Sequence, residues 1–233
     1  MIWNQVYESL LDVFFPRLCL LCKHQLFKQE QHLCLSCWYE LPKIQLKQVS
    51  HSPLIKVFQG RVEVKAAIAY LYFYRNGSAQ IIMHAIKYQG FKTLAFTIGA
   101  HFVKDQLVAI QSLGIQAFIP VPLHHKKHKQ RGYNQSELIA QGIASVAQLP
   151  VLSNVLQLLN YKSTQTHKSR FDRWLNAEKA YSVDVTALPE NISCVALVDD
   201  VVTTGATAEA CVRAIQGVSQ VQIVVLSVCF PLN

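Results

Sequence analysis

Apolar positions recur along the chain with two periods, and the alternation of these periods predicts an α/β protein. Strand-like runs of β-branched, aromatic or continuous apolar residues occupy about 64–74, 117–123, 194–198 and 221–230. Helical i, i+3, i+4 spacing occupies about 78–90, 93–111, 136–148 and 206–216. The residues between 123 and 136 are expected to form a loop. Strands that alternate with helices in this way predict a mainly parallel sheet covered by helices on both faces.

The N-terminal part of the chain has a different pattern. Its apolar residues have the spacing of an amphipathic helix that needs a surface to pack against: Ile2, Trp3, Val6, Tyr7, Leu10, Leu11 and Phe14. Residues 43–53 are rich in Lys, Gln and Ser and have the character of a linker. We therefore expect two domains, with residues 1–50 forming a small N-terminal unit and residues 51–233 carrying the sheet.

Composition supports a folded protein and narrows its location. Of the 233 residues, 51% are hydrophobic and only 15% are charged, which excludes the profile of a disordered chain. The longest apolar stretches fall far short of the roughly 18 residues that span a bilayer. The first 15 residues lack a basic leader and contain Glu8 and Asp12, which is not typical of a secretory signal. We therefore expect a cytoplasmic location without a membrane span.

The formal net charge of +8 at pH 7 is unevenly distributed. Counting Lys and Arg against Asp and Glu, it is +1 over residues 1–50, +5 over 51–120, +6 over 121–180 and −4 over 181–233. A basic middle indicates an anionic partner, and an acidic end indicates a task that needs carboxylates. Ordinary solvated Lys and Arg side chains would give the same counts, so charge alone does not decide between these interpretations.

Seven cysteines fall into two groups. Four of them form two C-x2-C pairs separated by eleven residues: Cys19, Cys22, Cys34 and Cys37. In a reducing cytosol this pattern favours a metal over disulfides, and two such turns complete the closed tetrahedral shell of a structural Zn²⁺. Replacement of one thiolate by His24 or His32, an iron–sulfur cluster and free thiols stay open as alternatives. The other three lie among apolar residues and are expected to be buried and inert: Cys194, Cys211 and Cys229.

Residues 194–207 carry the most informative pattern. An apolar strand ends in Asp199 and Asp200, and a loop of small and hydroxyl-bearing residues then opens a helix. Ligands of open α/β sheets bind at the carboxyl ends of strands, where a helix N-terminus offers N–H groups to phosphate. The acidic pair suits sugar hydroxyls or a divalent ion, so the segment predicts a ligand with both sugar and phosphate. In the alternative interpretation, Asp200 and Thr203 only cap the helix.

This segment resembles the 5-phosphoribosyl 1-diphosphate (PRPP) motif of type I phosphoribosyltransferases, in which apolar residues precede two acids and a Thr-Thr-Gly-x-Thr loop. Together with the four cysteines, three further motifs extend a resemblance to the ComF family over nearly the whole chain: Ile86-Lys87-Tyr88-Gln89-Gly90, Pro120-Val121-Pro122-Leu123-His124 and Arg131-Gly132-Tyr133-Asn134-Gln135-Ser136. ComF proteins are phosphoribosyltransferase-like competence proteins needed for DNA uptake in natural transformation. The resemblance implies a type I phosphoribosyltransferase-like fold for residues 51–233.

The resemblance also implies roles for individual residues. Asp199 and Asp200 would hold the ribose hydroxyls of PRPP, and Mg²⁺ would come with its diphosphate. The other implied PRPP-binding residues belong to the loop after the strand and to the diphosphate turn: Val201, Thr203, Thr204, Gly205, Ala206, Thr207, Val121, Pro122 and Leu123. Lys87 and Arg131 join the two aspartates as candidate catalytic residues, because cations stabilise a departing diphosphate. The candidates for DNA binding are the basic residues of two runs: Lys126, Lys127, Lys129, Arg131, Lys168, Arg170 and Arg173.

Two functions are compatible with these residues. The first is a competence protein that handles incoming single-stranded DNA and binds PRPP with Mg²⁺, for which the resemblance further implies DNA-uptake proteins at the inner face of the membrane as partners. Four aromatic residues close to basic ones in sequence are candidates to stack on bases: Tyr88, Phe91, Tyr133 and Trp174. The second is an active, Mg²⁺-dependent phosphoribosyltransferase whose acceptor no motif identifies.

Overall fold

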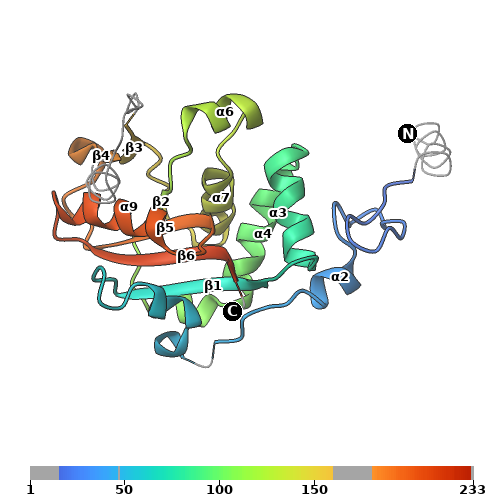
Figure 1. Ribbon diagram of the computed structural model, residues 1–233. Helices are drawn as coiled ribbons and strands as arrows, with labels where there is room; N and C mark the ends of the chain where they lie inside the picture. The colour runs from blue at the N-terminus through green and yellow to red at the C-terminus, as the bar shows by residue number, and fades with distance from the viewer. Residues whose placement is uncertain (1–15, 47, 160–179, 232–233) are drawn as a thin grey trace.

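The computed structural model describes residues 16–46, 48–159 and 180–231. Within them, a four-stranded sheet has the strand order β1-β6-β5-β2 (Figure 1). The strands are β1 (Ala66–Phe73), β2 (Ala117–Pro120), β5 (Cys194–Val201) and β6 (Gln222–Pro231). Each of the three pairings in this sheet is parallel. The predicted α/β class with a mainly parallel sheet is therefore confirmed, whereas the amphipathic helix predicted before residue 15 lies outside the described residues.

Helices connect the strands, and a short hairpin stands apart from the main sheet. The α-helices are α2 (Leu35–Tyr39), α3 (Ser78–Tyr88), α4 (Lys92–Asp105), α5 (Leu107–Gln111), α6 (His125–Arg131), α7 (Gln135–Ala147) and α9 (Ala206–Gln216). The 3₁₀ turns are η1 (Val49–His51), η2 (Pro53–Val57) and η3 (Val185–Ala187). The hairpin consists of β3 (Leu156–Leu158) and β4 (Tyr181–Val183), which pair antiparallel.

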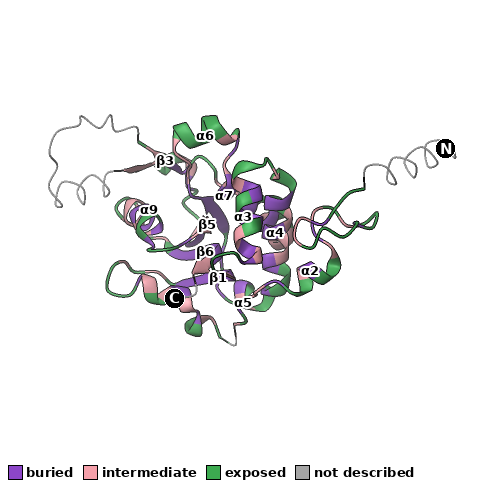
Figure 2. Ribbon diagram, turned by 45° about the vertical axis from the view of Figure 1, so that its right-hand side comes forward, coloured by how far each residue is buried: buried purple, intermediate pink, exposed green. Residues whose placement is uncertain are grey.

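Both faces of the main sheet are buried, as continuous apolar strands require. In β1, Ile68 and Tyr70 belong to an apolar cluster with α3, α4 and α7, whereas Ala67 and Ala69 belong to a second cluster with η2 and α9. Figure 2 shows α9 on one side of the sheet and α3 and α4 on the other. Because successive residues of a strand point to opposite faces, each central strand contributes to both clusters.

Helices α4 and α7 pack against each other at very close range because each contributes a glycine at the crossing. A Cβ built on Gly142 would lie 1.9 Å from the carbonyl oxygen of Phe96, and one built on Gly99 would lie 2.2 Å from the carbonyl oxygen of Ile139. Any side chain at these positions would separate the helices. The close packing fixes α7, whose first turn forms part of the site described below.

The N-terminal unit is attached to the side of the sheet that α3 and α4 cover. Leu26, Leu33 and Leu41 belong to the same apolar cluster as α3 and α4. On α2, Trp38 stacks on His101 of α4, with 4.2 Å between ring centroids. The unit is therefore held to the sheet part of the chain by apolar packing.

Three details of the secondary structure differ from the sequence-based expectation. The residues expected to form a loop contain α6, which begins where the His124 side chain accepts a hydrogen bond from the Lys126 N–H and ends at Gly132 in the left-handed conformation. The helix expected over 93–111 is two helices, α4 and α5, separated at Gln106. The β3–β4 hairpin was not expected at all, because each of its strands has only three residues.

One expectation from the apolar pattern agrees with the structure. Cys194, Cys211 and Cys229 are free and buried. Across the described ranges, we find no helix with the length and apolar character needed to cross a membrane.

Candidate functional site

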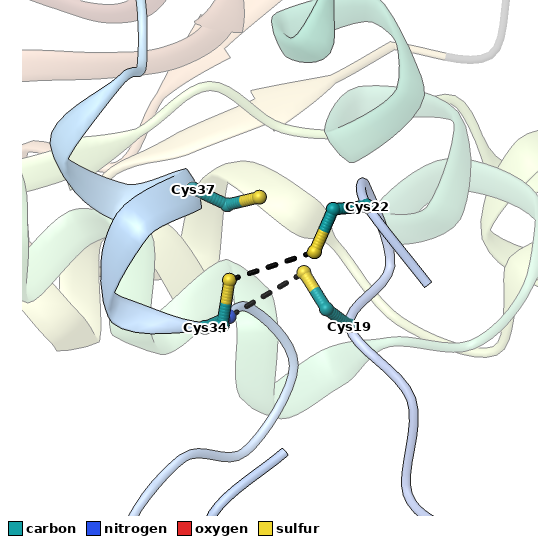
Figure 3. Close-up of side chains that lie close together, drawn as sticks. All are labelled: Cys19, Cys22, Cys34 and Cys37. Atoms are coloured by element: carbon teal, nitrogen blue, oxygen red, sulfur yellow. Dashed lines mark hydrogen bonds between the residues drawn. The ribbon is translucent and has the colours of Figure 1, made fainter. Parts of the chain in front are cut away.

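Four cysteine side chains converge in the N-terminal unit (Figure 3). Cys19 and Cys22 lie on a tight turn in which Lys23 N–H donates to the carbonyl of Cys19 at 3.0 Å. Cys34 precedes α2 as its N-cap residue, and Cys37 lies within α2. The four sulfur atoms all lie within 4.8 Å of one another. The turn and the helix thus bring both C-x2-C pairs to one point, as the sequence predicts.

The geometry of these sulfurs fits a tetrahedral Zn²⁺. Zn–S bonds of about 2.3 Å place sulfurs about 3.8 Å apart in a tetrahedron, and the Cys22 and Cys34 sulfurs are 3.6 Å apart. Burial opposes ionisation of Cys19, but N–H groups of Cys34 and Cys22 outweigh it and lower the pKa of Cys19 to about 6. Neither predicted histidine substitute joins this group of side chains, and the His32 ring instead contacts the ring of Phe91 at 5.2 Å. The chemistry of the donor set supports a structural zinc.

A second concentration of polar groups lies at the carboxyl ends of β2 and β5, where a cavity of about 290 Å³ opens. Strand β5 ends in Asp199 and Asp200, and both line the cavity. Val121 continues from β2, and its N–H donates to the Val198 carbonyl at 2.9 Å. The cavity therefore occupies the edge at which open α/β sheets bind ligands. Its lining brings together these residues: Lys87, Val121, Pro122, Leu123, His124, Lys127, Arg131, Asn134, Gln135, Ser136, Leu158, Tyr181, Asp199, Asp200, Val201 and Thr207.

The two aspartates have different surroundings. Asp199 is 8% exposed, and its Oδ1 accepts hydrogen bonds from Ser136 Oγ at 3.3 Å and from the Asp200 N–H at 2.8 Å. Burial, followed by repulsion from Asp200, raises the pKa of Asp199 to about 7. Asp200 pairs with Lys87 of α3, whose Nζ lies 3.0 Å from Asp200 Oδ2. A buried carboxyl beside an ion-paired carboxylate gives the site one group that gains or loses a proton near neutral pH.

The loop after β5 leads directly into α9, and no side chain caps the N-terminus of this helix. Gly205 is the N-cap residue in the left-handed conformation (φ 75°), and no side chain caps the helix. The interpretation in which Asp200 and Thr203 only cap the helix is therefore wrong. Of the hydroxyl residues predicted to cradle a phosphate, Thr207 lines the cavity, whereas Thr203 and Thr204 are exposed beside it.

Arg61 supports this loop from outside the sheet, and no pattern in the sequence indicated this role. Its Nη1 donates to the Thr204 carbonyl at 2.6 Å and to the Val57 carbonyl at 3.1 Å, and its guanidinium pairs with Glu209 of α9. A Cβ on Gly205 would lie 2.4 Å from Cγ1 of Val57. The segment around η2 therefore packs directly against the predicted phosphate loop.

Basic residues also line the cavity. Lys127 and Arg131 of α6 reach the cavity together with Lys87, whereas Lys126 and Lys129 are exposed on the same helix and do not line it. The remaining predicted DNA-binding residues lie outside the described residues: Lys168, Arg170 and Arg173. Helix α6 thus presents cations both to the cavity and to solvent.

Two aromatic candidates for base stacking have different positions. Tyr133 is buried and its hydroxyl donates to the Ile86 carbonyl, so stacking of a base on this ring is excluded in this conformation. Tyr88 is 59% exposed, and the Arg131 guanidinium lies over its ring at 5.2 Å. Trp174 lies outside the described residues.

Some cavity residues were not assigned a role from the sequence. Asn134, Gln135 and Ser136 come from the first turn of α7, and Asn134 Nδ2 donates to the Val121 carbonyl at 3.0 Å. Their motif was visible in the sequence, but its position beside Asp199 was not. Leu158 and Tyr181 come from the β3–β4 hairpin, for which there was no sequence signal.

A parallel sheet with an acidic pair at its carboxyl edge and a four-thiol cluster defines an α/β protein with an N-terminal zinc-binding unit. The double zinc ribbon domain family matches residues 10–48. Competence protein F of Haemophilus influenzae is 36% identical over 110 residues, which cover 46% of this chain and 48% of that protein. DNA utilization protein YhgH of Salmonella typhimurium is 30% identical over 130 residues, which cover 54% of this chain and 56% of that protein.

The comparisons agree with the motifs found in the sequence. The same-named protein of Escherichia coli K12 is 28% identical over 129 residues, which again cover 54% of this chain and 56% of that protein. The chain spans about half the length of the curated relatives it matches. These matches confirm the resemblance to the ComF family and the N-terminal zinc ribbon.

Proposed function

We propose that this protein handles incoming single-stranded DNA during natural transformation and binds PRPP with Mg²⁺ in the cavity at the edge of the sheet. The names of the relatives, a competence protein and DNA utilization proteins, support the DNA-related part. In this proposal residues 1–50 form a zinc-stabilised unit and residues 51–233 hold the ligand-binding site. The protein works in the cytoplasm with DNA-uptake proteins at the inner face of the membrane.

The PRPP part is carried by one observation: a single cavity brings two carboxylates and three cations together at the carboxyl edge of a parallel sheet. In the proposed complex, Asp199 and Asp200 accept hydrogen bonds from the ribose hydroxyls. Thr207 and the N–H groups at the start of α9 receive the 5′-phosphate, as helix N-termini do for anions. Lys87, Lys127 and Arg131 neutralise the diphosphate.

In this proposal Asp199 and Asp200 would be the protein carboxylates available to Mg²⁺ when it is bound with the diphosphate. Among the described residues, the four cysteines are the one group of three or more His, Cys, Asp or Glu side chains close enough to share a metal ion. The cavity therefore offers too few protein ligands for a metal cage, but Mg²⁺ commonly takes one or two carboxylates and completes its shell with phosphate oxygens and water. When bound, the ion would supply charge neutralisation for the diphosphate.

PRPP binding is tested by calorimetry with and without Mg²⁺. The wild-type protein should bind PRPP only with Mg²⁺ present, and the double variant Asp199→Asn, Asp200→Asn should lose this binding. Asp184→Asn serves as the matched control, because Asp184 does not line the cavity. Equal affinity in the double variant and the wild type would contradict the assignment of the aspartates.

DNA binding is assigned to α6, which is the most basic helix among the described residues. Replacing Lys126, Lys127 and Lys129 by Ala should weaken binding of single-stranded DNA and reduce the dependence of the affinity on salt concentration, because fewer counterions are released. Fluorescence anisotropy of a labelled oligonucleotide at several salt concentrations measures both. An unchanged slope would place the DNA on another surface.

Phosphoribosyl transfer is the second candidate function, and the acid–base composition of the cavity favours it. Preorganised cations stabilise a departing diphosphate without a protein nucleophile. Release of diphosphate from PRPP and Mg²⁺, assayed with a panel of bases, amines and single-stranded DNA, distinguishes an enzyme from a binding protein. The double aspartate variant is the control.

A further inference from the structure

Buried polar side chains in the described part of the chain concentrate at the cavity. Among the described residues, six polar or charged residues are buried. Three of these six line the cavity: Gln135, Ser136 and Asp199. Ser136 and Asp199 bond to each other, which gives both a partner. Gln135 differs from these two residues. It is only 1% exposed, and its buried side-chain Nε2 has no hydrogen-bond partner.

An unpartnered buried donor needs an explanation. Most buried polar groups in proteins have a hydrogen-bond partner, and a donor that lacks one destabilises the folded state. Gln135 is the first residue of α7 and is held in place by its neighbours. Asn134 bonds to the Val121 carbonyl on one side and Ser136 bonds to Asp199 on the other. Gln135 is therefore placed in the cavity lining between one residue that contacts the end of β2 and one that contacts the acidic end of β5.

A second unpartnered donor lines the same cavity. Arg131 Nε is buried without a partner, and Arg131 lies four residues before Gln135, on the other side of the turn that joins α6 to α7. Lys87 and Lys127 are the two other Lys or Arg residues in the lining of this cavity. An arginine Nε–H is a donor only, and the amide NH₂ of Gln135 is also a donor, so the missing partners of both are acceptor oxygens. The N-terminal end of α7, a helix of 13 residues, adds a partial positive charge at the same place.

We propose that Gln135 contacts the ligand and donates a hydrogen bond from its side-chain amide to an oxygen of the diphosphate, with Arg131 as its neighbour. This inference rests on the proposed PRPP function and adds a residue to it. A diphosphate oxygen fits better than a ribose hydroxyl, because Gln135 begins α7 and shares the cavity lining with Lys127 and Arg131, whereas the carboxylates of Asp199 and Asp200 supply acceptors for the hydroxyls. The cost of an unpartnered donor in the free protein is then recovered when the ligand binds.

The proposal predicts effects of opposite sign on stability and on binding. Gln135→Met keeps the length of the side chain and removes the donor. The variant should have a higher melting temperature than the wild type without ligand, and its affinity for inorganic diphosphate with Mg²⁺ should fall by about tenfold or more, as expected for loss of a hydrogen bond to a charged group. Its affinity for ribose 5-phosphate, which has no diphosphate, should change by less than about twofold.

Gln141→Met is the matched control, because Gln141 is an exposed glutamine on the same helix. It should change neither affinity. Gln135→Glu, which places a negative charge beside the ligand, should weaken diphosphate binding more than Gln135→Met does.

The outcomes separate the two proposals. If Gln135→Met binds diphosphate as tightly as the wild type does, whatever its melting temperature, Gln135 has a structural role only and the inference is overturned. An equal loss of ribose 5-phosphate and diphosphate affinity would also overturn it. If the wild type bound neither PRPP nor diphosphate, the proposed function would fail, and the inference with it.

Discussion

Replacing Asp199 by Asn removes a buried charge and keeps the shape of the side chain. The Oδ1 of Asn accepts the same hydrogen bonds that Asp199 receives from Ser136 and from the Asp200 N–H. Asp200 keeps its ion pair with Lys87. The variant therefore isolates the electrostatic cost of one carboxylate at the candidate site.

The magnitude follows from the pKa of Asp199. Burial and the nearby charge of Asp200 raise this pKa from its ordinary value of 3.8 to about 7. At about 1.4 kcal/mol for each pKa unit, the charged form in the empty cavity costs on the order of 4 kcal/mol. Because the folded protein binds this proton more tightly than the unfolded chain does, the group lowers stability as pH rises through this range.

The expected pH profile is specific. Below about pH 3 the carboxyl is protonated in both folded and unfolded states, so wild type and Asp199→Asn should be equally stable. The advantage of the variant should grow between about pH 4 and 7 and level off above pH 7. Urea unfolding between about pH 3 and 8, without ligand, measures the free energy of unfolding of both proteins.

Asp184→Asn is a matched control, for which the expected change in the free energy of unfolding has the opposite sign. The Asp184 carboxylate accepts hydrogen bonds from the side-chain hydroxyl and the N–H of Thr186, which lower the pKa of Asp184. This stabilisation is present above the ordinary pKa and is lost as pH falls through the lowered value, so the control should be slightly less stable than wild type at pH 7. A variant Asp199→Asn that is no more stable than wild type at pH 8 would refute the reasoning about burial.

Three further substitutions, with Cys211→Ser as a control, test the packing and the metal site. Gly205→Ala requires a left-handed alanine and forces its Cβ against Val57, so the free energy of unfolding should fall by about 2 kcal/mol or more in urea titrations, with weaker PRPP binding. Gly142→Ala pushes a methyl group against the Phe96 carbonyl and should cost about 3 kcal/mol in the same assay, and an unchanged midpoint would show that α4 and α7 are not closely packed. Cys22→Ser should reduce zinc, measured by elemental analysis, from one equivalent per chain and lower the melting temperature, whereas Cys211→Ser should leave the zinc content unchanged.

Much of the fold was predictable because its signals are local. A buried parallel strand is a continuous apolar run, and β5 and β6 were found close to their observed bounds for this reason. Helix α9 was found at its observed bounds, Ala206–Gln216, because its apolar residues have helical spacing. The zinc cluster was equally predictable, because each C-x2-C pair is a local motif and only eleven residues separate the two pairs.

The errors arose where local signals were weak or absent. Helix α6 has no buried residue, so it has no apolar stripe, and its run of His and Lys was interpreted as a loop. The break at Gln106 was missed because its side chain serves a distant partner: Nε2 donates to the Ile44 carbonyl at 3.0 Å, 62 residues away in sequence. Such a contact leaves no periodic pattern.

Some residues of the candidate site could likewise be predicted from the sequence, and others could not. The acidic pair and the loop after it were identifiable from residues 194–207 alone, because strand, carboxylates and helix start are consecutive. The partners of that pair were not: Lys87 comes from α3, Ser136 from α7 and Tyr181 from β4, and they meet Asp199 and Asp200 at one cavity only because a parallel sheet brings separate segments to a common edge.

The sequence was therefore sufficient to predict the class of the fold, the zinc ligands and the acidic motif, because each rests on short local patterns and on their order along the chain. Tertiary structure alone determined three other features: the support of the loop by Arg61, the raised pKa of Asp199 and the unpartnered amide of Gln135. Their properties depend on burial and, for Arg61 and Asp199, also on contacts with residues far away in sequence, such as Thr204 for Arg61 and Ser136 for Asp199. Burial sets the cost of a charge or of an unpaired donor, and it exists only in the folded chain.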